Sequence, residues 1–264
     1  MLPRVSQVPC EEADFLLFST EDLISNRLFK TGRWDDHLLG ITRFFLRDTQ
    51  NALVLDIGAN LGAYAVPIAK HLQASGGQVM AFEPQRIVYY QLCGNTILNR
   101  LDNLHAIHAA VGEKEGFIDI PDVDYAQSRN VGAFSIDPQY RELQGIGNSI
   151  QATHQRVRMV SLDALELNAS PAFIKMDVEG FEIGVLKGAH QFLERHRYPP
   201  MLFEAWNFDW FKQGRQELMD HFKYLGYVIS SLDSTDYIAQ HPQHPMEVSF
   251  TPAGEKQKRM TRIR

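Results

Sequence analysis

The stretch that decides the fold is ALVLDIGANLG, residues Ala52–Gly62. Its first four residues are apolar without interruption, which indicates a strand covered on both faces, as in a parallel sheet. Gly58 and Gly62 follow where the strand gives way to a helix, which we expect over Ala63–Leu72. Because Pro67 lies inside that range, we expect the helix either to be kinked there or to begin later. A glycine-rich turn of this kind lets a ligand approach the backbone and the helix N-terminus closely.

The alternation of strand and helix continues along the chain. We expect further strands at Gln78–Phe82, Leu104–Val111, Phe173–Met176, Met201–Phe203 and Tyr227–Ser231, and helices at Arg86–Asn99, Glu182–Glu194 and Gln216–Leu225. Strands separated by helices imply right-handed crossovers. The pattern therefore predicts an α/β fold with a mostly parallel sheet.

Three segments depart from this alternation. We expect residues 1–45 to form an N-terminal extension and residues 112–161 to form an irregular insertion in the main domain, residues 46–251. Long irregular insertions are usually functional or mobile, so both segments are candidates for a lid over the site. The polar, basic segment 252–264 is expected to be a frayed tail rather than an anion-binding arm.

Composition narrows the function classes. The chain has 264 residues, 44% of them hydrophobic and 22% charged, as in soluble globular proteins. A formal net charge of -6 disfavours nucleic acid as a partner. Cys10 and Cys93 are too far apart in sequence to suggest a disulfide framework or a zinc site, and neither a secretory leader nor a membrane span is visible. We therefore expect a cytoplasmic protein with no membrane partner, and a homo-oligomer stays open.

The turn after the first strand points to one class of cofactor. Glu83 ends the next strand, where a carboxylate can accept two hydrogen bonds from a ribose diol. Asn60 occupies the place of the second glycine of G-x-G-x-x-G, and the third glycine is missing, which disfavours a dinucleotide pyrophosphate. The Asn60 amide suits the amino-acid end of S-adenosylmethionine (SAM), and Asp56 is expected near its ammonium. Asp56, Gly58, Asn60, Gly62 and Glu83 are therefore candidate SAM-binding residues.

The motifs VLDIGANLG, FEP, IKMDVEGFE and VLKGA, in this order, resemble the FkbM-type class I SAM-dependent methyltransferases over roughly Asn51–Asn207. The resemblance implies a Rossmann-like, mostly parallel seven-stranded sheet with helices on both faces. It also implies methylation, mostly of hydroxyl groups on small molecules or sugars. Through it, Pro84 of FEP is a cofactor-binding residue, and the family's Asn-x-Gly-x-x-Ser element corresponds to Asn130, Gly132 and Ser135.

Acidic groups follow the later strands. Lys175, Asp177 and Glu179 alternate, which puts them on one side of an extended chain unless the backbone turns first, and Glu204 ends the next strand. We expect all four to be catalytic, because ligands bind at this edge of an open α/β sheet. Asp177 would take the proton of the acceptor hydroxyl, and Glu204 would orient the acceptor or share a Mg²⁺ ion with Asp177. The structural alternative is a Lys175–Glu179 ion pair with Asp177 capping a helix.

Other interpretations stay open. His154 is a rival base, and Trp206, Phe208, Trp210 and Phe211 are either core or the wall of an apolar acceptor pocket. A nicotinamide-dependent oxidoreductase and a non-catalytic adenosine-ligand-binding protein are the alternative functions. The Asn/Asp-Pro-Pro-Tyr/Phe element of adenine and glutamine N-methyltransferases is missing after the fourth strand, which disfavours N-methylation.

Overall fold

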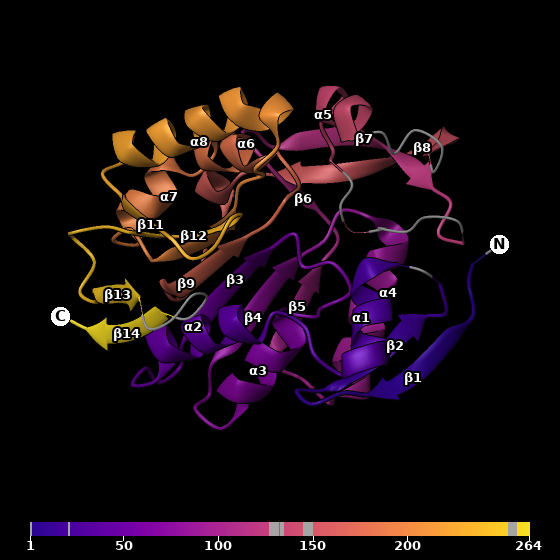
Figure 1. Cartoon of the computed structure of the whole chain (residues 1–264), viewed down its shortest axis with the longest axis horizontal. Helices are drawn as coiled ribbons and strands as arrows, with labels where there is room; N and C mark the ends of the chain where they lie inside the picture. Colours follow the sequence, from indigo (N-terminus) through magenta and orange to yellow (C-terminus); the bar gives the residue numbers. More distant parts are fainter. Residues whose placement is uncertain (1, 21, 127–131, 133–134, 145–149, 253–257) are drawn as a thin grey trace.

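A seven-stranded sheet forms the centre of the molecule, which we describe from a computed structural model covering residues 2–20, 22–126, 132, 135–144, 150–252 and 258–264. Its strands are β3 (Leu53–Ile57), β4 (Gln78–Phe82), β5 (Leu104–Ile107), β9 (Pro171–Met176), β10 (Met201–Glu204), β11 (Val228–Ser231) and β12 (Asp236–Gln240). Their order is β11-β12-β10-β9-β3-β4-β5 (Figure 1). The five strands from β5 to β10 are parallel, whereas β12 is antiparallel to both of its neighbours. The mostly parallel seven-stranded sheet is confirmed.

Helices cover both faces of this sheet (Figure 1). Apart from α5 (Pro138–Gln144), which belongs to the insertion, the described α-helices are α1 (Leu23–Thr31), α2 (Asp36–Leu46), α3 (Ala65–Gln73), α4 (Arg86–Leu98), α6 (Glu182–Lys187), α7 (His190–Arg195) and α8 (Lys212–Tyr224), with short 3-10 helices at Leu162–Ala164 and Asp209–Phe211. Buried side chains of α2 and α3 join one core cluster, and those of α6, α7 and α8 join another. The Rossmann-like architecture is therefore confirmed.

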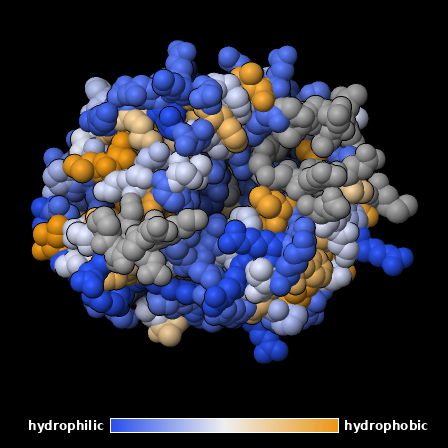
Figure 2. Space-filling view, in the orientation of Figure 1, coloured by the Kyte–Doolittle hydropathy of each residue, from blue (hydrophilic) through white to orange (hydrophobic). Residues whose placement is uncertain are grey.

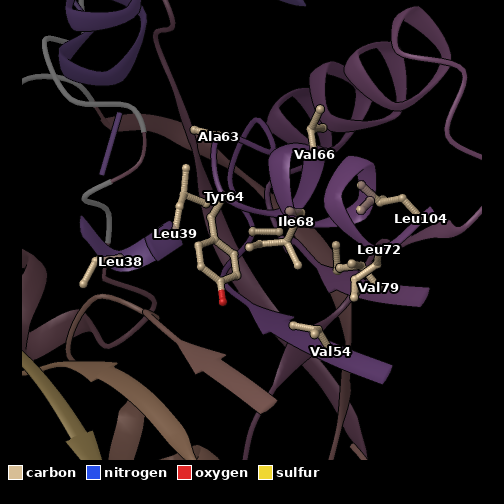
Figure 3. Packing of buried hydrophobic residues seen from close by; sticks show 14 of the residues in the cluster. Leu38, Leu39, Val54, Ala63, Tyr64, Val66, Ile68, Leu72, Val79 and Leu104 are labelled. Carbon is tan, nitrogen blue, oxygen red and sulfur yellow. The ribbon is translucent and has the colours of Figure 1, made fainter. Parts of the chain in front are cut away.

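The side chains of β3 show why its apolar run is continuous. Leu55 packs into the cluster with α6–α8, whereas Val54 faces α3, and both are fully buried. In Figure 3, Ile68 and Leu72 of α3 lie over Val54 and Val79 of the sheet. Each such fully buried aliphatic side chain contributes about 1.5–3 kcal/mol relative to exposure. A strand covered on both faces thus has no position for a solvent-facing polar residue before its end.

The helix after β3 begins at Ala65, later than the first boundary considered, so Pro67 lies in its first turn. Proline is tolerated there because the first N–H groups of a helix have no intrahelical partner. The predicted strand Leu104–Val111 is also corrected, because it divides into β5 and the short β6 (Ala110–Val111).

The predicted single helix Glu182–Glu194 is divided at Gly188 into α6 and α7. A Cβ atom at Gly188 would lie 2.2 Å from the carbonyl oxygen of Gly112. The chain therefore needs a glycine at the point where this connection passes the backbone of the insertion. Apolar periodicity runs through both helices and gave no sign of this contact.

Much of the insertion is regular, in contrast to the prediction. Strands β7 (Gly116–Val123) and β8 (Ile150–Val160) pair antiparallel, β6 pairs parallel with β8, and α5 (Pro138–Gln144) lies between β7 and β8 in the chain. Residues 127–131, 133–134 and 145–149 lie outside the described part of the chain.

The N-terminal segment forms part of the packed structure. β1 (Val5–Pro9) and β2 (Asp14–Phe18) form a hairpin that bonds to α4, with Leu16 N–H donating to Asn95 Oδ1 at 2.6 Å. Phe45 of α2 packs against Phe173 of the central sheet, with ring centroids 5.2 Å apart. A lid function for residues 1–45 stays a prediction.

The frayed-tail prediction is wrong for residues 258–262. β14 (Lys258–Arg262) pairs antiparallel with β13 (Val248–Pro252), and the Arg262 guanidinium donates to Asp48 at 2.9 Å. The hydrogen bonds between β13 and β14 satisfy backbone groups that the polar composition of this segment had suggested were exposed to solvent. Within the described residues, no helix combines the length and apolarity that crossing a bilayer requires. The face in Figure 2 is mainly hydrophilic with scattered hydrophobic residues.

Candidate active site

A cavity of about 790 Å³ lies where the parallel strands end. Residues directly after β3, β4 and β9 and the last residue of β10 line it: Gly58, Glu83, Asp177 and Glu204. Its size falls in the range of small-molecule sites, roughly 300–1,000 Å³. The carboxyl edge of an open parallel sheet is the expected place for such a site.

Gly58 is required by a close approach of two strands. Its φ is +84°, and a Cβ atom would lie 1.8 Å from the carbonyl oxygen of Asp177. Asp177 N–H donates to the Ile57 carbonyl at 2.9 Å, which holds the ends of β3 and β9 together. Glycine thus permits the backbone contact that brings Asp177 beside the turn.

Gly62 and Asp56 lie away from the cavity wall. A Cβ atom at Gly62 would lie 2.8 Å from Leu92, so this glycine serves the packing at the start of α3. The Asp56 carboxylate is 0% exposed and lies 3.5 Å from the Lys175 ammonium. The expected contact of Asp56 with a ligand ammonium is therefore not available in this structure.

Glu83 is a buried carboxylate that lines the cavity. Its two oxygens accept hydrogen bonds from the N–H groups of Asn60 at 2.9 Å and Gln85 at 2.8 Å. Burial raises the pKa of Glu83 to about 7, although these two N–H groups act in the opposite direction. Because each carboxylate oxygen has a second lone pair, Glu83 can still accept from a diol. Pro84 also lines the cavity.

Asn60 adopts a left-handed backbone conformation, with φ +52°, which asparagine tolerates better than most residues. A Cβ atom at Gly132 would lie 1.9 Å from the Asn60 amide nitrogen, so the two segments meet only because residue 132 is glycine. Both residues line the cavity. Ser135 is fully buried and accepts from Asp137 N–H at 3.2 Å, away from the wall, and Asn130 lies outside the described residues.

Lys175 links two carboxylates at the base of the cavity. Its ammonium lies 3.2 Å from Asp177 Oδ2 and 3.5 Å from Asp56 Oδ1, and 5.6 Å from the Tyr64 ring centroid. Burial acts to lower the pKa of Lys175, but the carboxylates of Asp177 and Asp56 outweigh it and raise that pKa. Burial also raises the pKa of Asp56 to about 6. Lys175 therefore stays charged and pairs with these two groups, not with Glu179 as the structural alternative supposed.

Asp177 does not cap the following helix either. The N-cap of α6 is Phe181, and Glu182 accepts the N–H groups of Val178 at 3.1 Å and Gly180 at 3.3 Å. Glu182 thus stabilises the turn after β9 and leaves Asp177, whose side chain is 36% exposed, on the cavity wall. Both parts of the structural alternative are therefore wrong.

Asp177, Glu179 and Glu204 converge, with one carboxylate oxygen of each lying within 4.8 Å of the others. Glu179 reaches this position through a turn, since its φ is +56° and that of Gly180 is +89°, and not through the period of an extended strand. Burial raises the pKa of Glu204 to about 9, with Asp177 and Glu182 adding to it, and burial also raises that of Glu179. Burial therefore favours the neutral form of both of these carboxyl groups.

These three groups supply the oxygen ligands that Mg²⁺ prefers. Lys175 already compensates the charge of Asp177 from one side. Bound Mg²⁺ therefore stays a prediction.

The aromatic residues after β10 divide between wall and core. Trp206, Phe208 and Trp210 line the cavity, and Phe208 stacks on Trp210 with centroids 5.1 Å and planes 10° apart. Phe211 is buried in the core. The sequence could not separate them, because a short loop and a 3-10 turn set their directions.

Sequence analysis named residues 1–45 as a candidate lid but no individual wall residue there, and it missed the wall residues at the start of β12. These residues include Arg27, Trp34, Asp35, Thr235 and Asp236. No motif marks them, and β12 itself was not predicted. No histidine is among the lining residues in the described part of the chain, and His154 is exposed on β8.

Comparison with known proteins places the site in a family. Residues 56–229 match the family model described as the methyltransferase FkbM domain. No curated protein sequence matches the chain.

Solved structures resemble the fold at low identity. A methyltransferase FkbM from Methylobacillus flagellatus KT is 19% identical with a TM-score of 0.47, and the alignment covers 72% of this chain and 44% of that one. A precorrin-6y C5,15-methyltransferase from Geobacter metallireducens GS-15 is 12% identical with a TM-score of 0.46, covering 78% and 88%. A putative O-methyltransferase from Klebsiella pneumoniae is 12% identical with a TM-score of 0.46, covering 79% and 81%. The chain thus spans less than half the length of the Methylobacillus protein.

Proposed function

The chain belongs to the FkbM methyltransferase family, and from that premise we propose that it transfers a methyl group from SAM to a hydroxyl group of a small molecule, sugar or natural product. The observation that carries the choice of a hydroxyl acceptor is the position of Asp177. Its carboxylate lines the same cavity as the turn at Gly58 and Asn60, and it is paired with the Lys175 ammonium at 3.2 Å.

The residues present fit the cofactor. Glu83 offers a buried carboxylate to a ribose diol, and Asn60 lines the same cavity with an amide that suits the amino-acid end. Asn60 in place of a second glycine disfavours a pyrophosphate at this turn. SAM, when bound, supplies a methyl carbon that an oxygen nucleophile can attack.

An alcohol is a weak nucleophile until its proton is removed, so a positioned base accelerates the transfer. Asp177 accepts the hydroxyl proton in this proposal. Lys175 is a positioning residue, because its bonds to Asp177 and Asp56 fix the direction of the Asp177 carboxylate. Glu204 lines the same cavity and can orient the acceptor.

The substitution Asp177→Asn tests the role of this carboxylate. We expect turnover to fall by about 100-fold or more, the usual contribution of a general base, while affinity for S-adenosylhomocysteine stays within a few-fold. Asp220→Asn on the exposed face of α8 is the matched control and should leave both unchanged. Turnover by Asp177→Asn within a few-fold of the parent, with cofactor binding intact, would show that Asp177 is not the base.

The type of acceptor atom is tested with SAM carrying a labelled methyl group and a panel of alcohols, sugars, phenols, amines and carboxylic acids. We expect label in products that resist alkali, as ethers do, and only from members with a hydroxyl group. Label found solely on amine nitrogen or in alkali-labile esters would overturn methylation of a hydroxyl group while leaving methyl transfer in place.

A further inference from the structure

Carboxyl groups outnumber cationic side chains in the cavity wall. Among the described lining residues, the acidic ones are Asp35, Glu83, Asp177, Glu179, Glu204 and Asp236, and the cationic ones are Arg27 and Lys175. The imbalance lies mainly on the acceptor side, since only Glu83 belongs to the turn assigned to the cofactor. A ligand on that side therefore meets several acidic groups at once.

The two cations compensate this cluster only in part. Lys175 is shared between Asp56 and Asp177, and the Arg27 guanidinium lies over the Trp34 ring at 5.4 Å. Within the described part of the chain, Glu179 and Glu204 form no ion pair, although one oxygen of each lies within 4.8 Å of the other. Two partly buried carboxyl groups this close repel each other when ionised, and a cation between them would relieve the repulsion.

Aromatic side chains line the same cavity as these carboxyl groups. A Cβ atom at Gly180, the residue after Glu179, would lie 2.8 Å from the Trp206 ring. Phe208, stacked on Trp210, is 54% exposed although it is large and apolar. Aromatic side chains next to carboxylates are the usual means of binding organic ammonium groups, through cation–π attraction together with ion pairing. A hydrated metal ion would gain nothing from the aromatic part of this wall.

We infer that the methyl acceptor carries an ammonium or quaternary ammonium group near its hydroxyl, held between Glu179, Glu204 and the faces of Trp206, Phe208 and Trp210. The inference rests on the proposed function and narrows its acceptor to amino sugars and amino alcohols. An ammonium group would favour the ionised forms of Glu179 and Glu204 and pair with them, whereas a neutral acceptor would supply no such counter-charge. Mg²⁺ at the same carboxyl groups is the alternative that the test must separate.

The chain provides its own reporter for this test. It has 3 tryptophans, Trp34, Trp206 and Trp210, and all of them line the cavity. Intrinsic fluorescence therefore reports on the wall itself. The protein saturated with S-adenosylhomocysteine is titrated with choline and with 3,3-dimethylbutan-1-ol, which has the same shape and hydroxyl but no charge. Glucosamine and N-acetylglucosamine form a second charged and neutral pair.

The charged member of each pair should bind about tenfold more tightly or better, a difference of about 1.4 kcal/mol. Glu179→Gln and Phe208→Ala should each weaken choline binding about fivefold or more, whereas Glu217→Gln, on exposed α8, should not. Equal binding within a pair, or no binding of the charged member, would overturn the inference. So would MgCl₂ that displaces choline and strengthens binding of the neutral alcohol.

Calorimetry with S-adenosylhomocysteine separates the two levels of proposal. Cofactor binding without preference for the charged probes would refute the ammonium acceptor and leave the methyltransferase proposal standing. Absence of cofactor binding in folded protein would refute both.

Discussion

Replacing Lys175 by methionine removes the cation between two carboxylates but keeps most of the side-chain volume. The Asp56 carboxylate would then be completely buried without its counter-charge, because its oxygens have no hydrogen-bond partner in the described residues and Lys175 is 3.5 Å away. Removing one partner of a buried pair usually costs about 3–5 kcal/mol. Uptake of a proton by Asp56 limits that cost, so the effect must depend on pH.

The sign and size of this dependence follow from the pKa of Asp56. Burial raises that pKa in the parent protein to about 6, against about 3.9 in an unfolded chain, so its stability contribution is lost as pH rises through 6. Without Lys175 the pKa rises further, and Asp56 stays neutral at pH 8. At pH 8 the variant must keep Asp56 protonated, which lowers its free energy of unfolding by about 3 kcal/mol relative to the parent, where Asp56 is ionised. At pH 5 Asp56 is mostly protonated in both proteins.

Urea unfolding at pH 5 and pH 8 measures this difference as a change in the free energy of unfolding. Lys175→Met should be destabilised by about 3 kcal/mol more at pH 8 than at pH 5. Lys187→Met, which removes the exposed pair with Glu217, should lose about 0.5 kcal/mol or less at both. Adding Asp56→Leu to Lys175→Met should remove the pH dependence. An equal loss at the two pH values would refute the assignment of a buried Lys175–Asp56 pair.

Two further predictions concern the turn. Gly58→Ala should destabilise the protein by about 3 kcal/mol or more, because φ is +84° and a Cβ atom would lie 1.8 Å from the Asp177 carbonyl oxygen. Gly40→Ala, in open space within α2, should stabilise the protein slightly. Thermal melts compare the two variants, and equal melting temperatures would contradict this prediction. Affinity for S-adenosylhomocysteine should fall about 30-fold from pH 8 to pH 5.5, since Glu83, whose pKa is about 7, must lose its proton to accept both diol hydrogen bonds. Calorimetry in Glu83→Gln should show weaker binding without this dependence, and a pH-dependent variant would exclude Glu83 as its source.

The central strands were predictable because burial on both faces requires an uninterrupted apolar run, and such a run is visible in the sequence. A strand with both faces covered must be apolar throughout, and β3 meets that condition up to Asp56. β12 (sequence DYIAQ) was missed because polar residues at both ends leave only a short apolar run. β14 (sequence KRMTR) was missed because it is mostly polar, and β13 pairs only with β14 within the described residues.

The candidate site was only partly predictable. The glycine turn and the acidic strand ends mark one edge of the sheet, so Gly58, Glu83 and Asp177 were identifiable from order and spacing. Whether a carboxylate at a strand end reaches the cavity depends on the register of the strand. Asp56 is completely buried beside Lys175, whereas Asp177, which also pairs with Lys175, is partly exposed on the cavity wall. Trp34 and Asp35 reach the wall through tertiary packing of the N-terminal segment, which no local pattern encodes.

Calorimetric titration of the folded protein with S-adenosylhomocysteine, beside a parallel titration with NADH, tests the central claim most directly. The cavity at Gly58, Asn60 and Glu83 predicts saturable heat with the thioether nucleoside and none with the dinucleotide. Saturable heat with NADH alone would contradict the assignment of this turn to SAM.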